Sequence, residues 1–153
     1  FDAAAAIICG PHITSFEAQG PMILESLCRQ PRAPVEMPLQ ADSDGVLRGD
    51  WQELLVRISD ERVSQQERAE LFHASMAQLL VEQALAVRDT DDVQQVGLAG
   101  GVFQNRVLTE LACSLLRDAG FTVLLPRQLP CNDAAICYGQ AAHVAAQNGI
   151  KES

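Results

Sequence analysis

A glycine pair between two different apolar patterns constrains the fold of this chain more than any other feature. An apolar run, Val96-Gly97-Leu98-Ala99, ends at Gly100-Gly101, and after a short polar stretch a helical pattern of leucines begins at Val107. A strand that stops at two glycines and feeds a helix exposes several backbone N–H groups, and the helix dipole favours negative charge at that end. The stretch therefore predicts an anion site, although a tight strand-to-helix turn without a ligand has the same pattern.

The residues around the glycine pair predict a βαβ unit. An apolar strand over 93–99 is followed by a helix over about 104–118, which Gly120 ends, and by a second strand over 121–125. Such a unit is expected to be parallel and right-handed. A last helix is predicted from Ala134 to about Gln147. The sequence thus predicts an α/β chain in which helices are in the majority.

Two loops of this unit are predicted to meet at one edge of the sheet. Ligands in open α/β sheets bind beyond the carboxyl ends of the strands, which would bring Gly100-Gly101 close to Asn132-Asp133. Backbone amides at the first loop suit a phosphate, and the Asp133 carboxylate suits a hard divalent cation. The alternative for Asn132 and Asp133 is N-capping of the last helix, which both residue types do well.

The start of the chain is predicted to be helical and contains an acidic candidate residue. Residues 1–9 form a helix that a Gly-Pro pair ends, and a second helix runs over about 14–28, kinked or delayed by Gly20-Pro21. Thr14 and Glu17 have the spacing of a capping box. Capping of the helix is therefore the structural alternative to any functional role of Glu17.

The middle of the chain is predicted to be a surface connector followed by two helices. Residues 29–50 are rich in proline and glycine, and Val35 to Leu39 can pair with Val46-Leu47 as a hairpin around the turn at 42–45. A short helix over 50–59 follows. Ser64 and Glu67 then form a capping box at the start of the most regular helix.

That regular helix is predicted to present one apolar stripe to a core and to end in an acidic turn at Asp89 to Asp92. His73 lies beside the stripe and is expected to be a satisfied or partly exposed helix histidine. No second histidine stands three or four residues away to form a metal pair. The stripe consists of Leu71 or Phe72, Met76, Leu79, Leu80, Gln83 and Val87.

Composition limits the classes of function open to the chain. Its 153 residues suit one domain, and its net charge of −9, from 11 basic and 20 acidic residues, makes broad nucleic-acid binding improbable. No run approaches the ~18 apolar residues of a membrane span. Five cysteines without a Cys-x-x-Cys pair indicate reduced thiols in a cytoplasmic protein. The first residue is Phe1, inside a helical pattern, so we expect a fragment of a longer chain.

Four blocks of the sequence resemble one family in order and spacing. They are Phe1 to Ala5, Phe16 to Glu25, Leu98 to Leu108, and Leu129 to Ala141. Each is similar to a segment of the HypF carbamoyltransferases, the hydrogenase-maturation proteins. Four ordered blocks that span nearly the whole chain are far more specific than any one of them.

The resemblance implies a fold and an activity. Residues 1–153 would be one domain, the C-terminal lobe of the actin/Hsp70/sugar-kinase-like (ASKHA) fold that HypF shares with the TsaD enzymes of tRNA modification. In that family, carbamoyl phosphate and ATP yield carbamoyl-adenylate. This domain then transfers the carbamoyl group to the C-terminal cysteine of HypE, toward the cyanide ligands of NiFe hydrogenase. The attacking thiol belongs to HypE, so no cysteine of this chain is required as a catalyst.

The resemblance also implies site residues. Gly100 and Gly101 would face the nucleotide phosphate, Asn105 would contact the adenosine side, and Glu17 would bond the ribose hydroxyls. Asp133 would bind a divalent metal ion of unknown identity, with Asn132 a weaker nucleotide-site candidate beside it. Developing negative charge during thiolate attack could be relieved by the metal and by N–H donors. Catalytic side chains are not identified.

The chain departs from the family pattern in ways that limit the expectation. Ala134-Ala135 stands where the family usually has two glycines, and Ala18 replaces another glycine. The family's His-x-x-x-His metal pair lies in the preceding lobe, and the histidines here lack that spacing. We therefore expect half a site, with weak nucleotide binding at best and no turnover. The rival hypotheses are a small-molecule kinase lobe of the same superfold and a non-catalytic module that docks a partner.

Overall fold

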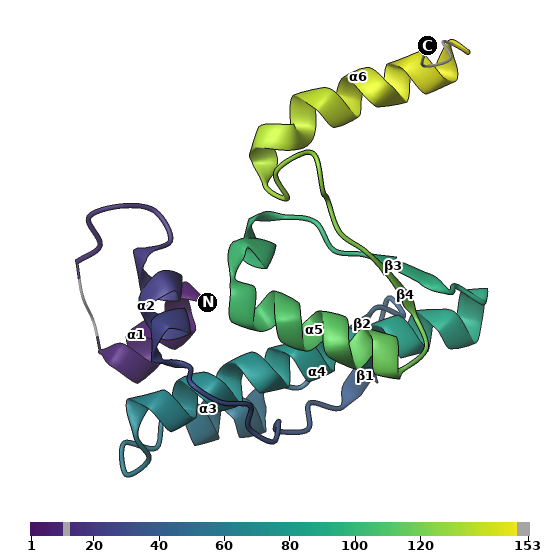
Figure 1. Cartoon of the computed structure of the whole chain (residues 1–153). Helices are drawn as coiled ribbons and strands as arrows, with labels where there is room; N and C mark the ends of the chain where they lie inside the picture. Colours follow the sequence, from purple (N-terminus) through teal and green to yellow (C-terminus); the bar gives the residue numbers. More distant parts are fainter. Residues whose placement is uncertain (11–12, 150–153) are drawn as a thin grey trace.

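One long helix, α4 (Gln65–Asp91), organises the molecule. It appears in teal in Figure 1, a computed structural model that describes residues 1–10 and 13–149; the predicted stop at Pro11 and the residue His12 lie outside this range. The helices α1, α2 and α3 pack around its first half and α5 packs along its second half. The other elements are α1 (Asp2–Cys9), α2 (Gln19–Leu27), β1 (Leu39–Ala41), β2 (Leu47–Gly49), α3 (Gln52–Ile58), β3 (Gln95–Gly97), the 3-10 helix η1 (Gly101–Gln104), α5 (Arg106–Asp118), β4 (Thr122–Leu124), the 3-10 helix η2 (Asp133–Ala135) and α6 (Ile136–Gln147).

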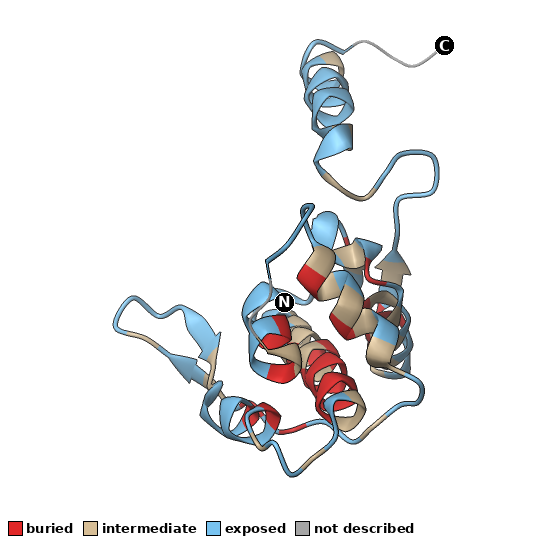
Figure 2. Ribbon diagram, turned by 90° about the vertical axis from the view of Figure 1, so that its left-hand side faces the viewer, coloured by how far each residue is buried: buried red, intermediate tan, exposed pale blue. Residues whose placement is uncertain are grey.

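The capping box at the start of α4 is confirmed. Ser64 Oγ accepts a hydrogen bond from Glu67 N at 3.2 Å, and Glu67 Oε2 accepts from Ser64 N at 3.3 Å. The expectation of a single apolar stripe is wrong for the middle of the helix, because every residue from Arg68 to Ser75 is buried. Neighbouring elements cover the helix on more than one side there (Figure 2). The helix also continues through most of the predicted acidic turn and ends at Asp91, with Asp92 as its C-cap at a φ of 51°.

The second helix begins later than predicted. Ala18, in the left-handed region with φ 63°, is the N-cap of α2, and Pro21 occupies the first turn, where no backbone N–H is needed. The predicted capping box between Thr14 and Glu17 is therefore absent from the described structure, because both residues precede the helix. The interruption at Gly20-Pro21 delayed the helix.

The predicted hairpin is present with shorter strands. β1 and β2 pair antiparallel with Gln40 opposite Arg48, around a turn in which Asp42 Oδ1 accepts from Asp44 N and Val46 N, each at 2.9 Å. The residues before β1 are not on the surface as predicted. Val35 and Met37 are buried in the core beside α4, so the connector contributes to packing.

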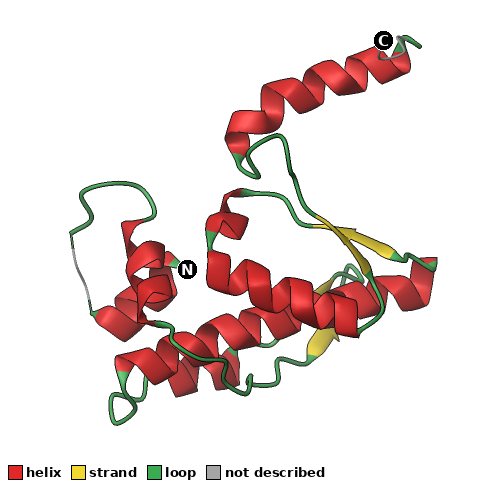
Figure 3. Ribbon diagram, viewed as in Figure 1, coloured by secondary structure: helices red, strands yellow, loops and turns green. Residues whose placement is uncertain are grey.

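The βαβ unit is confirmed, with three-residue strands. β3 and β4 pair parallel, Val96 opposite Val123, and α5 connects them and packs on α4 (Figure 3). The chain is therefore an α/β structure in which helices predominate. Among the described residues, no helix combines the length and the apolar character that a membrane crossing requires.

The last helix stands apart from the rest of the molecule. Figures 1 and 2 show α6 at the end of an extended segment after β4, away from the other helices. None of its residues is buried, and apolar side chains such as Ile136, Tyr138 and Val144 are more than half exposed. The segment that leads to it nevertheless passes close to the glycine turn.

Candidate functional site

The short stretch predicted between the glycine pair and the helix contains a 3-10 helix, η1. Gly100 has φ 113°, a value that favours glycine, and its N–H donates to Cys131 O at 2.5 Å. Gly101 does not begin α5 but begins η1, which ends at Gln104. The 3-10 helix thus separates the glycine pair from the N-terminus of α5. The bond to Cys131 confirms that the two predicted loops lie side by side.

The N-terminus of α5 is already occupied by groups of the chain itself. Asn105 Oδ1 accepts from Leu108 N at 2.9 Å and caps the helix. Glu25 Oε1, from α2, accepts from Arg106 N, also at 2.9 Å. A carboxylate at this position satisfies the helix dipole, so the amides of Arg106 and Leu108 are already engaged within the chain. The anion site at this helix terminus stays a prediction.

The backbone N–H groups of the turn that lack a hydrogen-bond partner among the described residues belong to the first residues of η1. Gly100 N is bound to Cys131 O and Phe103 N donates to Gly100 O, whereas Gly101 N and Val102 N have no hydrogen-bond partner within the described residues. Gly101 also has an ordinary φ, and a Cβ placed on it would meet no atom within 4 Å. Neither packing nor backbone strain in the described chain therefore requires glycine at this position.

Two hollows flank the turn and divide the predicted site residues. The first, about 590 Å³, is lined by Gly101, Asn105, Glu25 and Ala18. The second, about 370 Å³, contains Gly100, Asn132, Asp133 and Tyr138. Of the described residues, Glu17 lines neither hollow; it is exposed in the loop before α2.

The loop before α6 fulfils its predicted capping role at one residue. Asn132 Oδ1 accepts from Ala134 N at 3.2 Å, which confirms capping for Asn132. Asp133 is exposed at the start of η2 and lines the second hollow. Within the described part of the chain, no three His, Cys, Asp or Glu residues gather closely enough to hold a metal ion. Metal binding by Asp133 stays a prediction.

Asn105 has a partner that sequence reasoning missed. Its Nδ2 lies 2.8 Å from Nε2 of His73, the buried histidine of α4. Burial, the largest influence, lowers the pKa of His73, so the ring is neutral at physiological pH. The predicted satisfied histidine is confirmed. The sequence carries no signal of the Asn105 contact, because the burial of His73 follows from the packing around α4.

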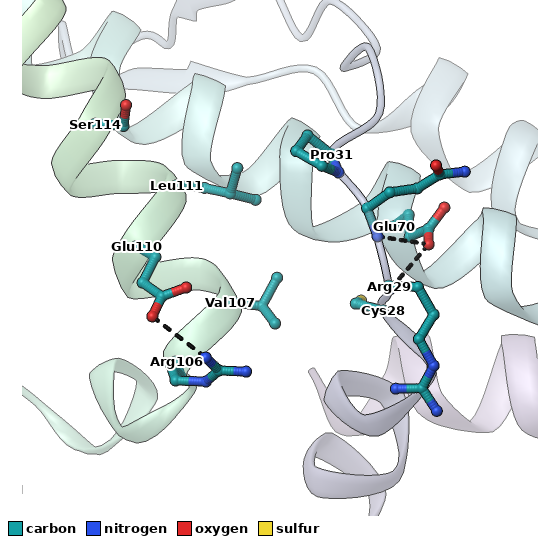
Figure 4. Close-up of a pocket in the computed structure, with 10 residues that line it drawn as sticks. Cys28, Arg29, Pro31, Glu70, Arg106, Val107, Glu110, Leu111 and Ser114 are labelled. Atoms are coloured by element: carbon teal, nitrogen blue, oxygen red, sulfur yellow. Dashed lines mark hydrogen bonds and ion pairs between the residues drawn. The ribbon is translucent and has the colours of Figure 1, made fainter.

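A further hollow, about 280 Å³, lies between α4, α5 and the loop after α2 (Figure 4). Glu70 of α4 accepts from Arg29 N at 3.0 Å and Gln30 N at 3.1 Å. Its second oxygen, Oε2, has no hydrogen bond, and the Arg32 guanidinium lies 3.9 Å from it. Burial, reinforced by the negative charges of Glu70 and Glu25, raises the pKa of Cys28 to about 12. The Cys28 thiol is therefore protonated and is a poor nucleophile.

Comparison with known proteins places these features in a family. Residues 1–140 match the family model described as "Carbamoyltransferase, Kae1-like Domain, second subdomain". Carbamoyltransferase HypF of Synechocystis sp. is 33% identical over 142 residues, which are 92% of this chain and 18% of that protein. Carbamoyltransferase HypF of Rhizobium leguminosarum bv. viciae is 33% identical over 144 residues, 94% of this chain and 18% of the relative.

A solved structure agrees with the sequence matches. The crystal structure of full-length HypF in the phosphate- and nucleotide-bound form superposes with a TM-score of 0.84 at 29% identity. The match covers 100% of this chain and 20% of that one. The chain thus spans about a fifth of the length of the proteins that it matches.

Proposed function

The chain belongs to the HypF carbamoyltransferase family, and we propose that it forms one wall of a nucleotide site used for carbamoyl transfer. In this proposal the chain is a lobe of an ASKHA fold, carbamoyl-adenylate is the donor, and the C-terminal cysteine of HypE is the acceptor. The proposal is supported by the names of the similar proteins and by the relative that was crystallised in a phosphate- and nucleotide-bound form.

The proposal rests chiefly on the unpaired backbone amide of Gly101. This amide and that of Val102 are unpaired among the described residues, and they belong to the turn beside the first hollow. The absence of a Cβ lets a phosphate approach these amides closely. The adenosine side would lie toward Asn105, with Glu17 on the neighbouring loop reaching the ribose.

In the proposed reaction this chain positions the reactants and does not supply the nucleophile. The acceptor thiolate forms a sulfur–carbon bond to the carbamoyl carbon, and the bond from that carbon to the phosphate oxygen breaks. AMP leaves with the electron pair on its phosphate, where N–H donors can stabilise the charge. Burial raises the pKa of the thiols of Cys9 and Cys28, in the second case to about 12. Neither of these thiols suits the role of nucleophile.

A divalent cation is implied by the family resemblance, and the described residues provide only part of a site for it. Asp133 offers one exposed carboxylate beside Gly100, while Asn132 Oδ1 is engaged as a cap. One carboxylate is fewer than the several oxygen ligands that a hard cation takes. The described residues alone therefore do not fit the ion, and no step of the transfer is assigned to it.

Substitution of Gly101 by alanine tests the nucleotide site. The protein at its natural length should be titrated with ATP by calorimetry, and its thermal unfolding recorded. Because a Cβ at Gly101 would meet no atom of the described residues within 4 Å, Gly101→Ala should leave the thermal unfolding midpoint unchanged. It should weaken ATP binding about tenfold, the effect of losing ~1.4 kcal/mol. Gly97→Ala is the matched control, since its Cβ also meets no atom and Gly97 ends β3.

The alternatives have distinct outcomes in the same protein. Unchanged ATP affinity in Gly101→Ala would remove the turn from the site. ATP hydrolysis that a small acceptor stimulates and carbamoyl phosphate does not affect would indicate a kinase instead. Loss of carbamoyl transfer in Asp133→Ala, with the fold and HypE binding intact, would support a metal role for Asp133, and unchanged transfer would exclude it. Residues 1–153 alone should bind ATP weakly and show no turnover.

A further inference from the structure

The buried histidine of α4 connects the glycine turn to the protein core. His73 is 0% exposed, and the rings of Phe1 and Phe72 lie 5.4 and 5.9 Å from its own, centroid to centroid. Its Nδ1 lies 2.8 Å from Ala69 O, one turn earlier in α4. Its Nε2 lies 2.8 Å from Asn105 Nδ2, at the junction of η1 and α5. This contact joins the most buried helix to the turn that precedes α5.

The partners of the ring determine where its proton lies. Nδ1 faces Ala69 O at 2.8 Å and Cys28 Sγ at 3.3 Å. The carbonyl oxygen can only accept a hydrogen bond and the sulfur can accept one weakly, so we assign the hydrogen to Nδ1. Nε2 is then bare and accepts a hydrogen bond from the Asn105 amide. A neutral ring is the form that a fully buried histidine without a carboxylate partner adopts. His73 therefore presents one fixed acceptor to the turn.

That acceptor decides which way the Asn105 amide points. With Nδ2 turned toward His73, Oδ1 is turned toward Leu108 N and caps α5. The reversed amide would place a donor against Leu108 N and an oxygen against the bare Nε2, and both contacts would be repulsive. Asn105 N also donates to Val102 O at 3.1 Å, which closes η1. The orientation selected by His73 thus holds the 3-10 turn whose first amides are those of Gly101 and Val102.

We propose that His73 is a positioning residue for nucleotide binding, acting through the Asn105 amide on the Gly101 turn, an inference that rests on the function proposed above. The ring is enclosed by protein and does not touch the ligand. Its effect is to keep the unpaired Gly101 and Val102 amides in one arrangement before the phosphate arrives, so that binding does not have to order them. The strength of nucleotide binding is then set partly within α4.

The test compares two replacements of His73 in the protein at its natural length. ATP binding is measured by calorimetry, and thermal unfolding is recorded for each variant. His73→Phe keeps a ring but removes the acceptor, and we expect about tenfold weaker ATP binding, the scale of one unpaired buried amide hydrogen. His73→Gln can place its amide oxygen at the Nε2 position and should bind ATP within about threefold of the natural protein. His73→Met, flexible enough for the same space, replaces the Phe variant if that variant does not fold.

A matched control and a double variant separate positioning from general loss of stability. Ser75, equally buried two residues later, bonds Leu71 O and Val35 N, so Ser75→Ala should lower stability and leave ATP affinity unchanged. In an Asn105→Ala background, His73→Phe should cause no additional loss, because its route to the turn is already removed.

The outcomes that contradict the inference are distinct. Unchanged ATP affinity in a folded His73→Phe or His73→Met protein would overturn it, as would a full additional loss in the Asn105→Ala background. Losses of ATP affinity in His73→Gln and Ser75→Ala as large as the loss in His73→Phe would show a general core effect and also overturn it. If the natural protein binds no ATP, the proposed function fails and this inference fails with it. Binding by the natural protein with unaffected variants overturns only the role of His73.

Discussion

The middle of α4 and the whole of α6 are both regular helix, yet their environments are opposite. From Arg68 to Ser75 every residue of α4 is buried, including four polar side chains. In α6 no residue is buried, and apolar side chains face outward. The buried stretch holds other segments through its polar groups. Arg68 binds carbonyls of α1 and α3, Glu70 binds the loop after α2, and Ser75 binds the segment before β1.

The difference shows that helix formation and fold stability are separate matters in this chain. Most helical stability in proteins comes from tertiary packing, and α4 has that packing over its central turns. α6 depends on its own backbone hydrogen bonds and side-chain propensities. Changes in α4 should therefore alter unfolding of the whole molecule, while changes in α6 should remain local.

The largest effect is expected at Arg68, which is 5% exposed. Its Nη1 donates to Ile58 O at 3.0 Å and its Nη2 to Ile8 O at 3.3 Å, near the C-termini of α3 and α1. Cations favour that end of a helix. Arg68→Ala should lower the free energy of unfolding by about 4 kcal/mol, through two lost charged hydrogen bonds and lost packing. Urea unfolding measures this.

Two further arginine variants make the Arg68 result specific. Arg68→Met retains much of the packing and should lose about half as much stability. Arg57→Ala, on the exposed face of α3, should cost no more than about 0.5 kcal/mol. A loss below about 1 kcal/mol for Arg68→Ala would contradict the view that α4 holds the other helices through this side chain.

A smaller effect is expected from one substitution made in each helix. Ala77 of α4 is 0% exposed, and Ala141 lies in exposed α6. Ala77→Gly should cost about 2 kcal/mol, roughly half from helix propensity and half from the lost buried methyl group. Ala141→Gly should reduce the helical circular dichroism and leave the urea midpoint unchanged. Equal shifts in the midpoint would mean that α6 unfolds together with the rest of the molecule.

The smallest effect is the loss of folding stability at acidic pH as Glu70 becomes protonated. Burial by itself would raise the pKa of Glu70, but hydrogen bonds from Arg29 N, Gln66 and Gln30 N outweigh it, and the pKa is lowered. A carboxyl with a lower pKa in the folded state contributes stability above its unfolded pKa of about 4.3 and loses it as the pH falls through the folded value. Stability should therefore fall as the medium becomes more acidic than about pH 4.

Urea unfolding between about pH 6 and about pH 3 measures that slope. Glu70→Gln removes the titrating group and should flatten the slope, whereas Glu110→Gln, on the exposed face of α5, should leave it nearly unchanged. An identical slope in the natural protein and the Glu70→Gln variant would assign acid sensitivity to other carboxylates. The contribution of buried α4 would then be independent of pH.

Local signals predicted the elements with strong end markers. The capping box at Ser64, the turn at Asp42 and the parallel pairing around α5 follow from short-range chemistry, and the structure contains each of them. The start of α2 was misplaced, because Thr14 and Glu17 have the right spacing while Pro21 and the left-handed Ala18 decide the boundary. Burial of Val35 and Met37 depends on contact with α4, which spacing does not reveal.

The sequence predicted which loops of the candidate site lie together, but not which backbone amides remain free to bind a ligand. The glycine pair and the Asn132-Asp133 turn are adjacent as expected, joined by the bond between Gly100 and Cys131. Which amides remain open depends on Glu25, distant in sequence, which occupies the start of α5. The contact between His73 and Asn105 is equally long-range. Such pairings require the packing of α2 and α4 to be known.

The two-stranded sheet of β3 and β4 has a consequence for handling the protein. In the described part of the chain both strands are edge strands, so each has a row of peptide groups without a neighbouring strand, beside exposed Leu124 and Leu125. Such an edge can template pairing between separate molecules. The net charge of −9 opposes this at neutral pH. Near the isoelectric point of about 4.6 that repulsion vanishes, and colloidal stability is then lowest.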